Sequence, residues 1–559
     1  MVKKVSLLYK DANRKLQLVE KSPEFIKDLQ FDRILQVMTS GTNNMNSENV
    51  IVSVLAELCN DINDITYRYD ILQDFTRQPQ MLSDLKSAFA AMMPIERDRQ
   101  LSNRRRAEVS AEYKINSGIN MLLGYCKVCK KVGEVLKASE NGILSEGLNN
   151  LLEVVFSYVG NEKFDKLEEL LMSLKKCAKG YIRIKLDASL TNSFKLKEAL
   201  VLDIDSNGFG KDESIKTHSS IGLKQLIGLG RKKESNYVIK EFDYILKENA
   251  DEIKTKILTN IANILEVMTV NISSFLRNLS QEILFYEGAV KLVQTMKNLD
   301  LITTRAEMAR AEERTLELQG IYDLSFALYL SDKGCSNSLR NIVTNDVCIR
   351  GGERIQIITG PNQGGKTTYI RALGILQVLA QAGIPVPAAK AVVSPVDQLF
   401  THFPVDEKPE SNEGRLGEEL QRMLNILENA TENSLVLMNE AFASTNSKEG
   451  SIIAQDILMA LAVIGARCSF VTHLYELANR VDSINNELLG LGRKCSSFIS
   501  MAAQYEECQC LTDEDAEGEI RKRTYRIIPG APSESSFAAD IAAQFGIRYM
   551  DFVQQLKED

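Results

Sequence analysis

One octapeptide limits the possible fold more narrowly than any other feature of this chain. It has the pattern GxxxxGK[ST] and reads Gly360-Pro361-Asn362-Gln363-Gly364-Gly365-Lys366-Thr367. An apolar run, IQIIT at 355–359, precedes it, and a helical pattern, TYIRALGILQVLA at 368–380, follows it. In such a strand–loop–helix the glycines let backbone N–H groups turn toward phosphates, and the helix N-terminus adds positive potential. The sequence therefore predicts an α/β domain that binds ATP, with Lys366 on the β- and γ-phosphates and Thr367 as a Mg²⁺ ligand.

Polar side chains follow two further apolar runs of this region. Asn439 and Glu440 follow SLVLM at 434–438, and His473 follows CSFVT at 468–472. P-loop ATPases usually place an acid at the first position after such a strand, for the Mg²⁺ shell, and a glutamate at the second, for the attacking water. Asn439 brings no charge, so we expect weaker metal binding, with Glu440 as catalytic base beside the metal and His473 as a γ-phosphate switch. The alternatives are a core strand with polar ends and a structural histidine.

The middle of the chain permits very long helices, because no proline occurs from 95 to 360 and proline breaks helix interiors. Apolar residues recur at steps of three and four over 253–284, and a second such run covers 148–174. Each run predicts one apolar stripe along a helix. Alternating apolar and polar residues at 181–187 predict a strand. We therefore expect two antiparallel helical arms over 110–295 that carry a small, partly β tip.

Length and composition exclude several classes of protein. The 559 residues exceed what one hydrophobic core holds and predict about three or four units. No segment offers about 18 uncharged apolar residues in a row, and the N-terminus lacks the apolar stretch of a signal peptide. We therefore expect a cytoplasmic protein without membrane contact. The net charge of −8 argues against coating nucleic acid through bulk charge, although clustered Lys and Arg can still neutralise phosphates.

Ten cysteines are scattered along the chain, and two pairs are closely spaced. Cys126 and Cys129 form a CxxC, and Cys508 and Cys510 form a CxC. A structural zinc site needs about four ligands at paired spacings. The chain has only three histidines, none of them beside these pairs. We expect reduced thiols.

Several segments resemble proteins of the MutS family. Those of the ATPase domain are TGPNQGGKTTYIRALG, LAQAGIPVPA at 379–388, NILENATENSLVLMNEAFASTN at 425–446 and VTHLYELA at 471–478. A TGPN-x-GGK loop followed by VPA, here at 386–388, is typical of that family. Residues 65–92 resemble the start of the MutS core and lever region, and residues 282–296 resemble its return helix. The resemblance covers nearly all of the chain from about residue 30 and is strongest from 335.

The resemblance implies a multidomain fold in which long α-helical core and lever arms with a small, partly β clamp tip precede an α/β P-loop ATPase domain of the ABC type. We expect the helical core to begin within 1–110 and the lever helices to cover 111–295, with the clamp tip near 185–240. A connector would cover 296–334. The ATPase domain would cover 335–559 and end in dimerisation helices.

The resemblance also implies roles for individual residues of the nucleotide site. Phosphates and magnesium would be held by Gly360, Asn362, Gly365, Lys366, Thr367 and Thr368, with Pro361, Gln363 and Gly364 completing the loop. Glu440 would be the base and His473 the switch. By position, Ile342 would lie near the adenine, where relatives often stack an aromatic ring, so apolar packing is expected in its place.

A homodimer with two ATPase domains packed head to tail is also implied. A loop that meets the partner subunit would contain Ser444, Thr445 and Asn446. The segment SNEGRLGEEL at 411–420 stands where the family has its trans-acting signature. The usual Ser-Thr-Phe core of that signature is not evident, and the candidates there are Ser411 and Gly414.

Double-stranded DNA is the expected partner, which would make the protein nucleoid-associated. Mismatch sensors of the family carry an N-terminal Phe-x-Glu wedge, and the roughly 30 residues before the core contain no such element. We therefore expect mismatched, branched or otherwise deformed DNA to be recognised by shape and backbone. Candidate contacts are the basic runs Arg104, Arg105, Arg106 and Arg231, Lys232, Lys233, although a charge run is usually a solvated face.

Three readings of function follow from these observations. The first is a MutS-like, DNA-dependent ATPase that hydrolyses ATP to ADP and phosphate in mismatch repair or recombination. The second is an SMC-like or Rad50-like ATPase, which is disfavoured because those proteins insert their arms between the two nucleotide motifs. The third is an ATP-gated scaffold for DNA or protein with little turnover, suggested by Asn439.

Overall fold

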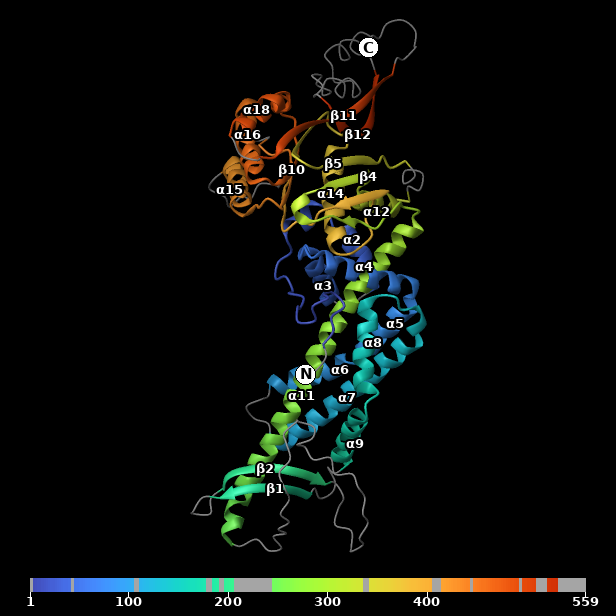
Figure 1. Cartoon of the computed structure of the whole chain (residues 1–559), viewed down its shortest axis with the longest axis vertical. Coiled ribbons are helices and arrows are strands. Elements are labelled where there is room, and N and C mark those ends of the chain that lie inside the picture. Colours follow the sequence, from blue (N-terminus) through green and yellow to red (C-terminus); the bar gives the residue numbers. More distant parts are fainter. Residues whose placement is uncertain are drawn as a thin grey trace, which may run out of the picture. The chain divides into compact units, whose positions relative to one another are not determined.

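The computed structural model describes residues 4–41, 45–104, 110–176, 183–190, 196–205, 244–334, 341–404, 414–442, 446–491, 495–508 and 520–530. The chain divides into two compact units (Figure 1). The first contains Met1–Ser6 and Gln78–Ile283, and the second contains Leu7–Arg77 and Leu284–Asp559. No helix among the described residues is both long and apolar enough to cross a membrane.

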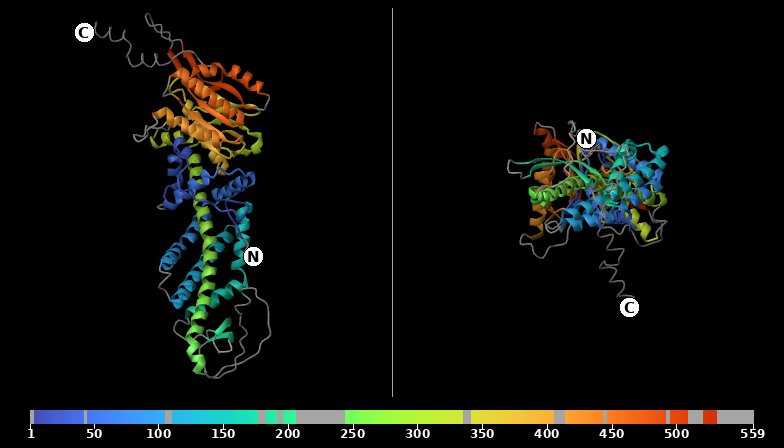
Figure 2. Two further views of the ribbon diagram at one scale, coloured as in Figure 1. Left: turned by 90° about the vertical axis from the view of Figure 1, so that its left-hand side faces the viewer. Right: turned by 90° about the horizontal axis from the view of Figure 1, so that it is seen from below.

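The first unit is mainly helical. Its elements are α5 (Pro79–Ala90), α6 (Met93–Arg104), α7 (Ala111–Ala138), η1 (Glu140–Gly142), α8 (Glu146–Val159), α9 (Glu162–Lys176), β1 (Arg183–Leu190), β2 (Leu196–Asp205) and the part of α11 (Tyr244–Asn298) up to Ile283. Figure 2 shows α7, α8 and α9 in blue to teal beside the green helix α11. The apolar side chains of Ile119 and Leu122 on α7, Leu171 on α9 and Leu265 on α11 pack together. The strands β1 and β2 form an antiparallel pair.

Two of the helical predictions for this region have different outcomes. The stripe at 253–284 lies within one helix, α11, as predicted. The run at 148–174 was predicted as one helix, and this was wrong, because α8 ends at Val159 and α9 begins at Glu162. Gly160 caps α8 by donating its N–H to the carbonyl of Phe156, and glycine disfavours helix interiors. The strand predicted at 181–187 is present as β1, while 206–243 of the expected tip lie outside the described residues.

The second unit contains helices and two mixed sheets. Its first elements are α1 (Glu24–Asp28), α2 (Asp32–Thr39), α3 (Met45–Ala56), α4 (Ile62–Arg77), the end of α11, β3 (Glu307–Met308), η3 (Ala311–Glu313), β4 (Leu316–Ile321), α12 (Leu324–Asp332) and β5 (Asn345–Ile349). These are followed by β6 (Glu353–Thr359), α14 (Lys366–Gln381), β7 (Lys390–Val393), β8 (Leu399–His402), α15 (Gly414–Asn429), β9 (Leu435–Asn439) and α16 (Ser447–Ile464). The last are β10 (Arg467–Val471), α17 (Tyr475–Asn479), α18 (Val481–Gly490), β11 (Ser497–Cys508) and β12 (Ile520–Pro529).

The larger sheet has the strand order β12-β11-β6-β10-β9-β8 (Figure 1). Its strands are parallel except for β12, which runs antiparallel to β11. The apolar runs predicted as strands at 355–360, 434–438 and 467–473 are β6, β9 and β10. The smaller sheet has the order β3-β7-β4-β5. The predicted combination of long helices with an α/β region is thus confirmed at the level of fold class, and the domain boundaries stay predictions.

Both faces of the larger sheet are covered, which explains its continuous apolar strands. On one face Ile355, Ile357, Val436 and Phe470 belong to a buried cluster with residues of α15 to α18. On the other face α14 approaches so closely that a Cβ on Gly374 would lie 2.7 Å from Leu437. This close packing fixes α14, and with it the loop at its N-terminus, against the strands that carry the other polar residues.

Candidate nucleotide-binding site

The loop between β6 and α14 has a backbone that only glycine adopts easily. Gly360 and Gly365 have φ angles of +141° and +88°, a region that L side chains rarely enter. A Cβ on Gly360 would also lie 2.6 Å from the Cβ of Ala503 on β11. The glycines therefore let the loop close tightly against the sheet and leave its backbone free to face a phosphate.

Lys366 begins α14 and points back into this loop. Its Nζ donates hydrogen bonds to the carbonyls of Gly360, at 2.8 Å, and Pro361, at 2.9 Å. The side chain is buried, and burial lowers the pKa of Lys366 to about 8, although Glu440 opposes the shift. The ammonium is thus a desolvated cation inside the loop, where electrostatic attraction to an anion is stronger than in water.

The next residue, Thr367, contacts the end of β9. Its hydroxyl donates a hydrogen bond of 3.1 Å to the side-chain oxygen of Asn439. A hydroxyl and an amide oxygen side by side are hard oxygen ligands of the kind that Mg²⁺ prefers. Thr367 and Asn439 therefore fit a magnesium site. Both side chains are neutral, which distinguishes this site from one that contains a carboxylate ligand.

Glu440 follows Asn439 and lies beside His473, which comes after β10. The distance between Glu440 Oε1 and His473 Nε2 is 3.3 Å, and each side chain is 37% exposed. The hydrogen bond from His473 lowers the pKa of Glu440, burial opposes the shift, and the charges of His473 and Lys366 add to the lowering. Glu440 is therefore an accessible carboxylate at neutral pH, as a general base must be.

A cavity of about 520 Å³ adjoins the loop. Gly365 and Thr368 line it from the loop and α14, and Ile342, predicted to lie near the adenine, lines it as well. Its other lining residues include four aromatic side chains that the sequence did not single out, Tyr322, Phe326, Tyr369 and Tyr525. The cavity offers flat apolar surface next to a phosphate-binding loop.

Different contacts hold these aromatic residues in place. Asp323 caps α12 by accepting a hydrogen bond of 3.1 Å from the N–H of Phe326. The backbone of Tyr525 is left-handed, with a φ of +59°. Asn345 binds it on both sides, donating to the carbonyl of Tyr525 and accepting from the N–H of Ile527. The cap by Asp323 could have been predicted, because an Asp before an apolar run is typical of a helix N-terminus. No local sequence pattern predicts the position of Tyr525.

The remaining predicted residues of the loop and the dimer segments lie as follows. Asn362 and Gln363 are exposed, and Gln363 accepts a hydrogen bond of 2.7 Å from Arg523 on β12. Asn446 caps α16 by accepting from the N–H of Lys448. Gly414 is exposed and begins α15. Ser411, Ser444 and Thr445 lie outside the described residues.

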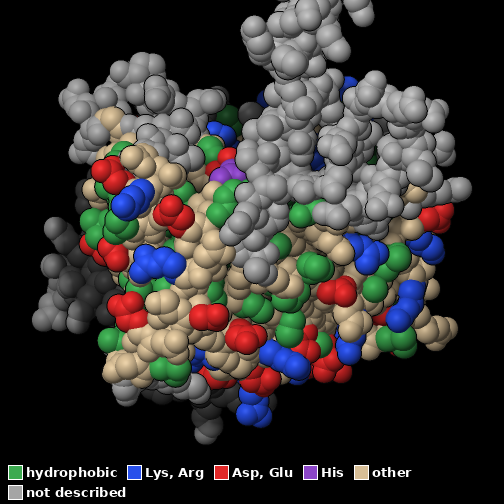
Figure 3. Space-filling view, turned by 90° about the horizontal axis from the view of Figure 1, so that it is seen from above, with side chains coloured by type: hydrophobic (Ala, Val, Ile, Leu, Met, Phe, Trp, Pro, Cys, Tyr) green, Lys and Arg blue, Asp and Glu red, His purple; other side chains and the backbone are tan. Residues whose placement is uncertain are grey.

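Of the residues predicted to contact DNA, only Arg104 lies within the described part of the chain. Arg104 is the last residue of α6. Arg105, Arg106, Arg231, Lys232 and Lys233 lie outside the described residues, as does the acidic segment at 513–519. On the face seen in Figure 3, basic and acidic side chains of the described part are interspersed and form no single basic patch.

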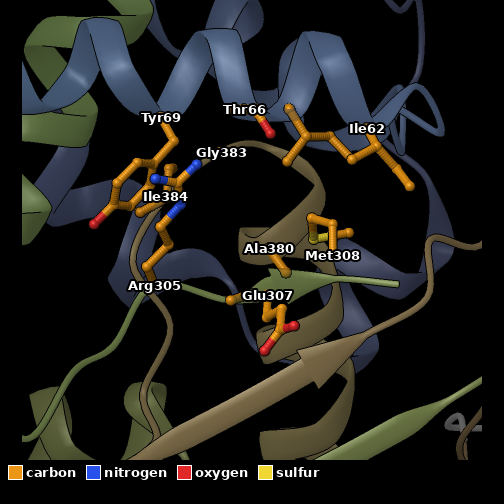
Figure 4. A pocket seen from close by; sticks show the side chains of 11 residues that line it. Ile62, Thr66, Tyr69, Arg305, Glu307, Met308, Ala380, Gly383 and Ile384 are labelled. Atoms are coloured by element: carbon orange, nitrogen blue, oxygen red, sulfur yellow. The ribbon is translucent and has the colours of Figure 1, made fainter. Parts of the chain in front are cut away.

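A second cavity, of about 300 Å³, lies at the other end of α14. Ile62, Thr66 and Tyr69 of α4 face it, and Ala380 lines it from α14 (Figure 4). The guanidinium of Arg305 lies 4.4 Å from the centre of the Tyr69 ring at its rim. Because Lys366 and Ala380 are separated by about 20 Å of helix, this cavity is distinct from the one beside the loop.

The cysteine pairs do not form a metal centre in the described part of the chain. No group of three or more His, Cys, Asp or Glu side chains that could hold a metal ion is found among the residues described. Cys126 and Cys129 are free thiols on α7, and burial raises their pKa values to about 11 and about 12. Cys510 lies outside the described residues.

Fold and site together define a nucleotide-binding protein of the P-loop class. Two family models match the chain: MutS domain V over residues 356–506, and the MutS2 N-terminal domain over residues 60–299. The chain belongs to the MutS family. MutS proteins are ATPases that use a divalent metal, bind DNA and act as dimers.

Known relatives match parts of the chain. Endonuclease MutS2 of Lacticaseibacillus casei is 28% identical over 288 residues, 51% of this chain and 33% of the relative. Endonuclease MutS2 of Thermus thermophilus is 31% identical over 37% of this chain and 27% of its own length. DNA mismatch repair protein MutS of Chlorobium phaeobacteroides is 40% identical over 24% of this chain and 16% of its own. The matches span a third or less of each of these relatives.

Proposed function

We propose that this protein hydrolyses ATP to ADP and phosphate while clamping mismatched, branched or otherwise deformed double-stranded DNA in mismatch repair or recombination. The observation that carries the proposal is the meeting of three strand ends. The loop after β6, Asn439 and Glu440 at the end of β9, and His473 after β10 lie at one edge of the parallel sheet. Ligands of open α/β sheets bind at the carboxyl ends of the strands.

The proposed ATP site combines the loop with the adjoining cavity. The backbone of 360–365 and the ammonium of Lys366 would bind the phosphates, and Thr368 would line their path. The adenine would lie against Ile342 and the aromatic side chains of the cavity, so Tyr525 would supply stacking that Ile342 does not.

The magnesium ion would be held by Thr367 and Asn439, with Glu440 close by. When bound, it would neutralise charge on the phosphate oxygens. Glu440 would accept a proton from water, because its carboxylate is ionised and accessible. His473 would hold the Glu440 carboxylate in position and respond to the γ-phosphate.

The proposed DNA clamp and homodimer rest on the family, since MutS proteins bind DNA and act as dimers. The hairpin of β1 and β2 belongs to the region expected to be the clamp tip. Ser411, Gly414, Ser444, Thr445 and Asn446 would meet the partner subunit. The interspersed charges on the face seen in Figure 3 are compatible with DNA being recognised by its shape.

One observation favours a second candidate function, an ATP-gated scaffold that turns over little. The residue that contacts Thr367 is the neutral Asn439, and a site without a carboxylate at this position attracts a cation less strongly. Binding and switching would then persist while hydrolysis is slow.

ATP hydrolysis by the purified protein with homoduplex, single-mismatch and four-way-junction DNA tests the proposal. Stimulation by junction or mismatch above homoduplex, lost in Glu440→Ala, is the expected result. Stimulation by the mismatch alone would assign base-specific reading to this chain. Nucleotide binding without hydrolysis would favour the scaffold function. A rate of hydrolysis that is the same with and without each of the three DNA substrates would contradict a DNA-dependent activity.

A further inference from the structure

The backbone directly after β9 is strained at two positions. Glu440 has a φ of +50°, and Phe442 has a φ of +64°. Both are left-handed conformations that are unfavourable for residues with a Cβ. Such strain persists only where surrounding groups hold it, and it gathers at functional sites. The contacts of this short turn therefore decide where the Glu440 carboxylate lies.

Three contacts hold the turn. The N–H of Glu440 donates to the carbonyl of Val471 at 2.8 Å, which ties the turn to β10. The ring of Phe442 is fully buried and stacks on His402, with 6.4 Å between ring centres and 20° between planes. The N–H of Phe442 donates to Oε2 of Glu419 at 3.0 Å. Of these three contacts, only the hydrogen bond to Glu419 involves a charged side chain.

We infer that Glu419 is a positioning residue for the proposed hydrolysis. Its carboxylate accepts the N–H of Phe442, keeps the turn in its left-handed form, and so holds Glu440 beside His473. Glu419 lies 23 positions before Phe442 in the chain, on α15, whereas Lys366 and Thr367 stand at the start of α14. Its expected influence is on the placement of the base and not on the binding of nucleotide.

The place of Glu419 in the chain adds a second consequence. It lies on α15, which begins at Gly414, within the segment proposed to meet the partner subunit. About one and a half helical turns, roughly 8 Å along the helix axis, separate Glu419 from Gly414. A displacement of α15 at the subunit interface would therefore reach the Glu440 turn through the hydrogen bond from the Phe442 N–H to Glu419.

A matched set of variants of the full chain tests this inference, which rests on the proposed ATP hydrolysis. Glu419→Met keeps the length of the side chain and removes the acceptor, whereas Glu419→Gln keeps an acceptor oxygen. Glu428→Ala is the control, because Glu428 lies on the same helix outside 411–420, is exposed, and has no hydrogen bond or ion pair to the described residues. Should Glu419→Met fail to fold, Glu419→Ala takes its place.

We expect Glu419→Met to lower kcat by about 10- to 100-fold, because a misplaced catalytic group is this costly, with the Kd for ADP changed less than about threefold. Glu419→Gln should recover most of the activity, and Glu428→Ala should match the wild type. Equal kcat in Glu419→Met and the wild type would overturn the inference. So would a parallel loss of ADP binding, or a Glu419→Gln variant as slow as Glu419→Met.

Hydrogen exchange separates this inference from the proposed function. Amide exchange in peptides covering 440–442 should accelerate in Glu419→Met and not in Glu428→Ala, because only the first variant removes the acceptor of the Phe442 N–H. If the wild type hydrolyses no ATP but exchange accelerates as expected, the proposed function fails and the positioning contact stands. Unchanged exchange in Glu419→Met would overturn the inference whatever the activity.

Discussion

Two glutamates, one in each unit, have lowered pKa values but differ in how far their side chains are exposed. Glu96 on α6 accepts hydrogen bonds from Tyr125 and Ser273, and Arg99 and Arg277 lie within ion-pair distance. Burial alone would raise the pKa of Glu96, but these neighbours outweigh it. Glu440 has one ion-pair partner among the described residues, His473, and is 37% exposed, against 12% for Glu96.

The difference separates a carboxylate that stabilises a fold from one that is free to react. Glu96 accepts hydrogen bonds from α7 and α11 and has Arg99 and Arg277 nearby, so its oxygens are occupied by groups of the fold. Glu440 keeps an accessible oxygen, and its strained backbone points it at the edge of the sheet. A lowered pKa by itself therefore does not identify a catalytic group.

The largest expected effect is on hydrolysis when Glu440 is replaced. Glu440→Gln should lower kcat by about 10²- to 10⁴-fold, because it removes the base without changing the shape of the side chain. Steady-state ATPase assays measure this, with ADP binding and Tm as controls for folding. An equal loss of kcat in Glu96→Gln would contradict the distinction between a reactive Glu440 and a structural Glu96.

Lys366→Ala should weaken ATP binding by about 10- to 100-fold, since a hydrogen-bonded charge contributes roughly 1.5–3 kcal/mol. Titration calorimetry measures the change. Lys390→Ala is the control, because Lys390 is exposed on β7 of the smaller sheet. An unchanged ATP affinity in Lys366→Ala would contradict the proposal that this loop binds the phosphates of ATP.

Glu96→Leu should lower the free energy of unfolding by about 2–4 kcal/mol, because it leaves Tyr125 and Ser273 without their acceptor and two arginines without a counter-charge. Denaturant unfolding monitored by circular dichroism measures this loss. Hydrolysis per folded molecule should stay unchanged. A kcat that falls together with stability would mean that Glu96 contributes to the reaction.

Asn439→Asp should lower the Mg²⁺ concentration at half-maximal ATPase activity by several-fold, since a carboxylate attracts the cation more strongly than an amide. A magnesium titration of the variant and the wild type measures the difference. An unchanged or higher requirement would show that the neutral side chain does not limit metal binding.

The smallest expected effect is the pH dependence that Glu96 adds to stability. Because its folded-state pKa lies below the ordinary value of 4.5, its contribution is complete above that pH and is lost as pH falls through the folded-state pKa. The wild type should therefore lose stability below about pH 4.5 more steeply than Glu96→Gln. Parallel pH curves of the two proteins, from denaturant unfolding, would contradict this account.

The sequence by itself determined the parts of this protein that depend on neighbouring residues. The glycines and Lys366 of the loop follow a local pattern, and so does the long apolar stripe of α11. Asn439, Glu440 and His473 were predictable because each stands at or just after the end of an apolar strand, and ends of parallel strands meet at one edge of a sheet. Their roles in hydrolysis stay predictions.

Only the tertiary structure decided the contacts between distant segments. Asn345 and Tyr525 are 180 positions apart, and Glu96 and Ser273 are 177 apart. The bond from Phe442 to Glu419, 23 positions apart, likewise left no periodic signal. The physical reason is that a pattern records which face of an element is apolar, whereas the partner that a polar group finds depends on how the elements pack.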